Sequence, residues 1–159
     1  MKTAIIYATS HGTTTKVANI IVGKLGIENC QIFNIKEEKN IDISKFEQII
    51  IGGSIHAGNI QKSIKDFCKD NIEILLEKRI GLFVCSMYEG ENAVKQLENA
   101  YSDLLRKHAK SVKILGGEFL LDKMNFFEKL IVKKVAGVKE NESKIDEANI
   151  ALFIDELTQ

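Results

Sequence analysis

Hydroxyl side chains and a glycine crowd one short stretch near the beginning of the chain. Residues 5–14 read IIYATSHGTT, an apolar run that leads into five groups able to bind an anion through a hydroxyl or a backbone N–H: Thr9, Ser10, Gly12, Thr13 and Thr14. The residues that follow have helical spacing, and the first turn of a helix attracts anions through its free N–H groups and its dipole. The stretch therefore predicts a phosphate site. The stretch contains no arginine, so we expect the helix dipole to provide most of the phosphate binding.

The spacing of these residues argues against several other phosphate-binding classes. The stretch lacks the G-x-x-x-x-G-K-[ST] motif of P-loop NTPases and the G-x-G-x-x-G motif of dinucleotide-binding Rossmann domains. A receiver domain needs an aspartate at the end of its third strand, where this chain has Gly52, Gly53 and Ser54.

Two further polar turns follow apolar runs, and ligands bind outside the carboxyl ends of the strands in an open parallel sheet. We therefore expect the three turns to share one site. The candidates in the second turn are Ser54, Ile55, His56, Ala57, Gly58 and Asn59, and those in the third are Ser86, Met87, Tyr88, Glu89 and Gly90.

The histidines are the remaining candidates for chemistry. His56 is the residue we would test as an acid, a base or a substrate contact, and the competing interpretation is a passive loop histidine. We expect His11 to act in the phosphate loop through its backbone. No cluster of cysteine, histidine and carboxylate side chains has metal-ligand spacing, so we expect no metal.

Apolar runs and amphipathic stretches predict the elements that must position these turns. Buried strands are expected over residues 2–8, 30–35, 46–54, 79–86 and 111–119, and helices over residues 14–25, 60–77, 92–108 and 145–157. Strands that alternate with helices imply right-handed crossovers and a parallel sheet. We therefore expect an α/β three-layer sandwich, built as a single domain over residues 1–159. Residues 122–138 are additional to this pattern and also have helical spacing.

The composition is that of a globular protein, with 45% hydrophobic and 28% charged residues. The apolar run at residues 4–8 is too short for a signal peptide, so we expect a cytoplasmic location. Cys30, Cys68 and Cys85 are odd in number and widely spaced, which argues against both disulfides and a zinc site. The net charge is zero, but residues 106–139 hold nine Lys or Arg against three acidic residues, which indicates a basic patch.

The first stretch resembles the FMN-phosphate signature of the flavodoxin family. The matching positions are Ile5-Ile6-Tyr7-x-Thr9-x-x-Gly12-x-Thr14-x-x-x-Ala18-x-x-Ile21. The resemblance implies a flavodoxin-like sheet with strand order 2-1-3-4-5 and non-covalently bound FMN as cofactor. It also implies that the candidates of the three turns, with His11, bind that cofactor. A chance strand–loop–helix is the competing interpretation.

The second and third turns also resemble those of flavodoxins. By that resemblance the Gly58–Asn59 peptide faces the flavin N5, and Tyr88 stacks on the ring. Ala57 cannot stack as an aromatic or methionine would, so His56 or Tyr88 would cover the flavin, or one face would stay open to a substrate. Gly58 as a simple turn residue and Tyr88 as a loop anchor are the competing interpretations.

The neighbouring sequence resembles one branch of the family, the flavodoxin-type menaquinone-dependent protoporphyrinogen IX dehydrogenases. The resemblance lies in residues 54–58, in Lys62, Ser63 and Phe67, and in residues 127–137. It implies an oxidoreductase that passes electrons from a small-molecule substrate to a quinone or another acceptor. The chain lacks that branch's longer basic insertion and its Arg/Tyr/Pro-rich stretch. The alternatives are a soluble low-potential electron carrier and a non-redox binding module that has lost FMN.

The basic stretch bounded by Lys123 and Lys139 suggests where partners would dock. It could rest on an anionic membrane, at the inner face, or on an acidic redox partner protein. The competing interpretation is a core-packing helix with a solvated lysine face. We expect no nucleic-acid partner, and the sequence leaves the oligomeric state open.

Overall fold

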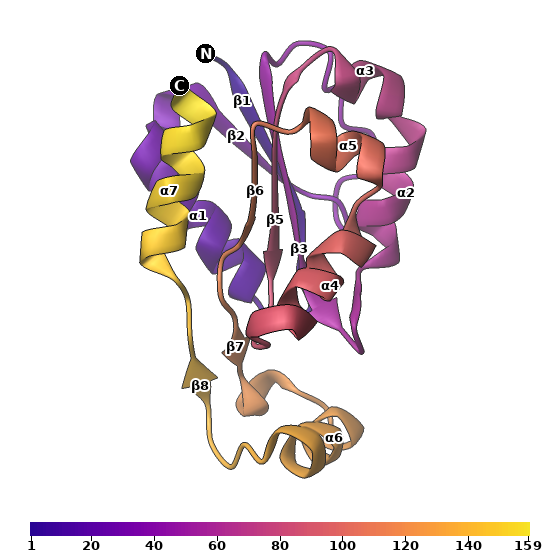
Figure 1. Ribbon diagram of the computed structural model, residues 1–159, viewed down its shortest axis with the longest axis vertical. Coiled ribbons are helices and arrows are strands. Elements are labelled where there is room, and N and C mark those ends of the chain that lie inside the picture. The colour runs from indigo at the N-terminus through magenta and orange to yellow at the C-terminus, as the bar shows by residue number, and fades with distance from the viewer.

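Five parallel strands form the centre of the molecule in the computed structural model, which describes residues 1–159 (Figure 1). In spatial order they are β2 (Cys30–Asn34), β1 (Thr3–Ala8), β3 (Gln48–His56), β5 (Arg79–Cys85) and β6 (Ser111–Ile114). A two-residue strand, β4 (Asn59–Ile60), folds back on β3 as a hairpin. When the five parallel strands are numbered along the chain without the hairpin strand β4, their spatial order is the predicted 2-1-3-4-5. The predicted α/β sandwich is confirmed.

Helices cover both faces of the sheet (Figure 1). One face carries α1 (Thr13–Leu25) and α7 (Glu147–Thr158), and the short 3-10 helix η1 (Ile27–Asn29) follows α1. The other face carries α2 (Lys62–Asp70), α3 (Ile72–Leu76), α4 (Gly90–Ala100) and α5 (Asp103–His108). The layers follow from the alternation of strand side chains, since Ile49 and Ile51 belong to one buried cluster and Ile50 to the other. Each such isoleucine contributes roughly 1.5–3 kcal/mol by burial.

Two of the predicted long helices are broken. Residues 60–77 divide at Asn71, whose side-chain amide donates to the carbonyl of Phe67 at 2.9 Å. Residues 92–108 divide at Tyr101, which has extended backbone angles. The buried Tyr101 hydroxyl hydrogen-bonds the carbonyls of Ile51 and Phe83 at 3.1 and 2.6 Å, so the sheet fixes this break.

The predicted fifth strand ends early, at Ile114. Gly116 has φ 74°, and a Cβ on it would lie 1.9 Å from the carbonyl oxygen of Lys144. The chain then forms β7 (Glu118–Phe119), which pairs antiparallel with β8 (Glu142–Ser143). These two strands are the base of an excursion, residues 120–141, that we call the arm.

The arm contains the 3-10 helix η2 (Leu121–Lys123) and α6 (Phe126–Ala136). Figure 1 shows α6 beyond the carboxyl ends of the strands, apart from both helical layers. Asn125 and Glu128 form a capping box that begins this helix. No residue of α6 is buried, so the interpretation of this stretch as a core-packing helix is wrong. No helix of the structure combines the length and the apolar character that crossing a bilayer requires.

Candidate functional site

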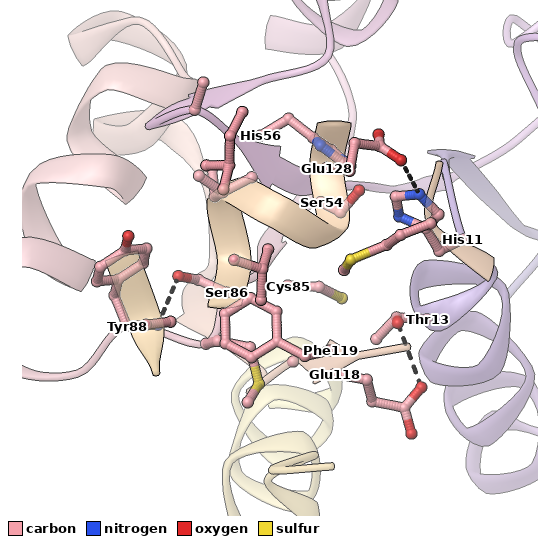
Figure 2. A pocket seen from close by; sticks show the side chains of 18 of the residues that line it. His11, Thr13, Ser54, His56, Cys85, Ser86, Tyr88, Glu118, Phe119 and Glu128 are labelled. Atoms are coloured by element: carbon pink, nitrogen blue, oxygen red, sulfur yellow. Dashed lines mark hydrogen bonds and ion pairs between the residues drawn. The ribbon is translucent and has the colours of Figure 1, made fainter. Parts of the chain in front are cut away.

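The three predicted turns meet at one cavity of about 310 Å³ at the carboxyl ends of the strands. Eleven predicted residues line it: Thr9, His11, Thr13, Ser54, Ile55, His56, Ala57, Gly58, Ser86, Met87 and Tyr88. Six others lie in the same turns without lining the cavity: Ser10, Gly12, Thr14, Asn59, Glu89 and Gly90. Figure 2 shows side chains from all three turns directed around this space.

The first turn has the open helix end that the sequence predicts. Gly12 precedes α1 with φ 100°, and its N–H donates to the Thr9 hydroxyl at 2.9 Å. The N–H groups of the first turn of α1 have no acceptor within the helix. These N–H groups offer donors to an anion. The Thr14 hydroxyl is fully buried and contacts the Cys85 thiol rather than a nitrogen or oxygen atom.

Basic groups reach this turn from elsewhere in the chain. The Lys36 ammonium, just after β2, donates to the Thr9 carbonyl at 2.6 Å and lies 3.4 Å from the Ser10 hydroxyl. The Lys123 ammonium, at the end of η2, lies 3.3 Å from where a Cβ on Gly12 would be. The expectation that the helix dipole provides most of the phosphate binding is therefore incomplete, because the tertiary structure supplies cations that the loop itself lacks.

A carboxylate also lies beside this helix end. Glu118 of β7 accepts a hydrogen bond from the Thr13 hydroxyl at 3.2 Å (Figure 2) and another from Lys16 at 2.9 Å. Burial works to raise the pKa of Glu118, but hydrogen bonds from Lys16, Ser143 and Thr13 outweigh it and hold the pKa below its ordinary value. Glu118 therefore stays ionised and competes with an incoming anion for Thr13.

The second turn is a two-residue hairpin between β3 and β4. Its central residues, Ala57 and Gly58, both have positive φ, 46° and 78°. Such a turn matches the twist of the two strands, which is why glycine suits it and alanine is strained there. At its base, Gln61 accepts from the Ser54 N–H and donates to the Ser54 hydroxyl at 2.6 Å. The turn is thus held firmly at the mouth of the cavity.

Two histidines lie next to one another in the lining of the cavity. The rings of His11 and His56 have centroids 5.3 Å apart, and the His11 Nε2 lies 3.2 Å from the Glu128 carboxylate of α6 (Figure 2). The expectation that His11 acts through its backbone alone is therefore incomplete. Burial and the proximity of His11 lower the pKa of His56, against the opposing influence of Glu128. His56 is consequently mainly neutral near pH 7 and able to accept a proton.

The third turn is anchored by its serine. The Ser86 hydroxyl donates to Gln96 at 2.6 Å and accepts from the Tyr88 N–H at 3.1 Å. The Tyr88 side chain is 45% exposed, so it lines the cavity from its rim. Glu89 pairs instead with Lys144 at 3.3 Å.

The arm supplies a wall that the sequence did not predict. Four apolar residues on one side of α6 line the cavity opposite the turns: Ile131, Val132, Val135 and Ala136. Other lining residues also lay outside the prediction: Cys85, Gly117, Glu118, Phe119, Met124 and Glu128. The helical spacing of residues 122–138 did indicate α6, but spacing within one segment does not show what its apolar side faces.

Comparisons with known proteins agree with this geometry. A family model described as a flavodoxin domain matches residues 4–146. Flavodoxin 1 from Bacillus cereus is similar in structure, with 15% identity, coverage of 100% of this chain and 99% of that chain, and a TM-score of 0.58. A short-chain flavodoxin associated with a non-canonical PDU bacterial microcompartment has 18% identity, 99% and 97% coverage, and a TM-score of 0.60. A Fusobacterium nucleatum flavodoxin bound to flavin mononucleotide has 21% identity, 99% and 96% coverage, and a TM-score of 0.51. A search of curated protein sequences gave no match.

Proposed function

The chain belongs to the flavodoxin family, and from this premise we propose that it is an FMN-dependent oxidoreductase whose cavity admits an apolar substrate beside the cofactor. FMN is the cofactor that the flavodoxin domain binds, and when bound it supplies the electron-transfer chemistry. The protein's part is to anchor the phosphate, exclude water and place hydrogen-bonding groups around the ring.

The residues of the first turn suit the phosphate of FMN. The first-turn N–H groups of α1 and the Lys36 ammonium would donate to it, and a phosphate monoester has three acceptor oxygens. The second and third turns would hold the ring, with the Gly58–Asn59 peptide at its edge and Tyr88 at the rim. His56 would act there as a neutral proton acceptor or as a substrate contact.

The apolar wall of α6 is the observation that carries the substrate proposal. An apolar substrate beside the cofactor would pack against Val132 and Ala136, which line the cavity opposite the turns. Ala57, which is exposed, offers no ring to stack on the flavin, so a second flat molecule could lie there. By resemblance to the dehydrogenase branch, protoporphyrinogen IX is the candidate substrate and a quinone the candidate acceptor.

Oxidation of protoporphyrinogen IX by the FMN-loaded protein, with menaquinone as acceptor, tests this proposal. We expect Val132→Asp to abolish oxidation with FMN still bound, because a charge in the apolar wall excludes the substrate. Val94→Asp, an exposed change on α4, is the matched control and should retain activity. Absence of oxidation by the fully loaded wild-type protein would overturn the proposal.

An electron carrier is the second candidate, because flavodoxins pass electrons to redox partner proteins. Its supporting observation is the exposed Tyr88 at the rim, where a partner could approach the cofactor. Stepwise reduction of the loaded protein separates the candidates. Two well-separated one-electron steps, together with inactivity toward protoporphyrinogen, would favour the carrier.

The outer side of α6 supports peripheral contact with an anionic membrane. Phe126 and Phe127 are each 74% exposed and Leu130 is 54% exposed, and none of the three lines the cavity. Lys133 and Lys134 lie among them on the helix, which Figure 1 shows at one end of the molecule. Aromatic and lysine side chains together on a protruding helix suit the interface of an anionic bilayer.

Sedimentation with lipid vesicles tests this contact. We expect binding to phosphatidylglycerol vesicles and not to phosphatidylcholine vesicles, and loss of binding in Phe126→Ser/Phe127→Ser. Ile27→Ser removes an equally exposed apolar side chain from η1 and should bind like the wild type. Failure to bind anionic vesicles would overturn the contact and favour an acidic protein partner.

A further inference from the structure

The arm and its base contact the phosphate loop at three successive residues. Glu128 lies 3.2 Å from His11, the Lys123 ammonium lies against Gly12, and Glu118 accepts from the Thr13 hydroxyl. These contacts join segments more than one hundred residues apart in sequence. The loop that would hold the phosphate is therefore also the loop on which the arm rests.

The ammonium of the exposed Lys123 side chain lies at the open end of α1 without an ion-pair partner. It lies beside the residue that precedes α1, where the helix dipole is equivalent to roughly half a positive charge. No carboxylate lies within ion-pair distance of Lys123. The nearby Glu118 carboxylate is paired with Lys16 instead. An anion between this ammonium and the helix end would be attracted by both.

Lys36 approaches the same loop from a different segment. Its ammonium donates to the Thr9 carbonyl and lies 3.4 Å from the Ser10 hydroxyl, and it also has no carboxylate partner. Two cations from different parts of the chain thus reach a loop that contains neither lysine nor arginine. A phosphate monoester carries about −1.5 to −2 charge at neutral pH and matches this pair.

We propose that Lys123 is a ligand of the FMN phosphate, contributed by the arm, and that the bound phosphate thereby holds the arm over the cavity. This inference rests on the proposed FMN site. The phosphate would join Lys123 to the N–H groups of α1, because both attract it. Closure of α6 over the ring would then require the phosphate, so riboflavin, which lacks it, would bind without closing the arm.

Flavin affinity measured by fluorescence quenching gives the first test. We expect Lys123→Met to weaken FMN binding by about tenfold or more, since it removes a charge-assisted hydrogen bond, and to leave riboflavin binding within about twofold. Lys139→Met makes the same charge change elsewhere on the arm and should bind FMN like the wild type. Lys123→Arg should retain most of the affinity.

Limited trypsin digestion of the full chain gives the second test, because it reports on the arm and not on affinity. Cleavage after Lys129, Lys133 and Lys134 is followed by mass spectrometry at saturating flavin. We expect FMN to slow cleavage at these sites in the wild type and riboflavin to have little effect. In Lys123→Met, saturating FMN should give no more protection than riboflavin.

Three outcomes overturn the inference. The first is an unchanged FMN affinity in Lys123→Met, and the second is an equal loss of FMN affinity in Lys139→Met. The third is equal protection of the wild-type arm from trypsin by FMN and riboflavin. If the wild type binds neither flavin, the proposed FMN site itself fails. That outcome is distinct, because each of the other three requires flavin to bind.

Discussion

Glu118 places a nearly buried carboxylate beside the helix end that would hold the phosphate. Because its pKa is held below the ordinary value, it is negative at neutral pH and repels a phosphate. We expect Glu118→Gln to raise FMN affinity about fivefold at low salt, and less at high salt, since screening weakens the repulsion. Fluorescence titration at two salt concentrations measures this. Glu142→Gln, on the neighbouring strand, is the control, and equal or weaker binding in Glu118→Gln would contradict the expectation.

His56 makes the stability of the apo protein depend on pH. Its pKa in the folded state is below 6.5, so the unfolded chain binds the proton more readily. The stability that neutral His56 contributes is therefore fully present above about pH 6.5, and it is lost as the pH falls through the folded-state pKa. We expect His56→Asn to flatten this acidic decline in urea unfolding measured from pH 7 downward. An equally steep decline in His56→Asn would show that other groups cause the loss of stability at acidic pH.

Among the elements, the β3–β4 hairpin contains a local strain that glycine can relieve. Ala57 is the only residue other than glycine with positive φ. We expect Ala57→Gly to raise the free energy of unfolding by up to about 1 kcal/mol, because removing Cβ relieves this conformation more than it frees the unfolded chain. Urea unfolding with and without the substitution measures the difference. A destabilisation would show that the Ala57 side chain makes a contact that outweighs the strain.

The arm is an element that the core does not need. Neither buried cluster includes a residue of the arm, whose one buried side chain is Leu121, and Phe119 and Glu142 are already paired at its base. We expect replacement of residues 120–141 by an Asn-Gly turn to preserve the circular dichroism spectrum and cooperative unfolding. FMN affinity should fall, because Lys123 and the α6 wall are removed. Loss of cooperative unfolding would show that the arm stabilises the sheet.

At the scale of the whole molecule, FMN would connect the sheet, the three turns and the arm. A ligand that binds only the folded state stabilises it by mass action, by about 2.7 kcal/mol at one hundred times its dissociation constant. We expect the thermal midpoint to rise with FMN concentration, and riboflavin at the same multiple of its own dissociation constant to raise it by a similar amount, because the stabilisation depends on that ratio. Scanning calorimetry measures both. A midpoint independent of FMN would contradict binding to the native state.

The sequence alone determined the sheet, its helical layers and the cofactor loop. These depend on local patterns: the continuous apolar run of β3, helical spacing in α1, and a glycine where the loop has positive φ at Gly12. Helix breaks were missed because they depend on distant partners, such as the two carbonyls that bind the Tyr101 hydroxyl.

Only the tertiary structure decided what surrounds the loop. Glu118 and Glu128 lie 105 and 117 residues from their partners Thr13 and His11, and Lys123 is equally remote from Gly12. Residue spacing within one segment does not predict such long-range contacts, because they depend on where β7 and β8 direct the arm. The chain's pattern of residues thus specified the phosphate loop, and the folded arrangement specified the charges and the apolar wall that act on it.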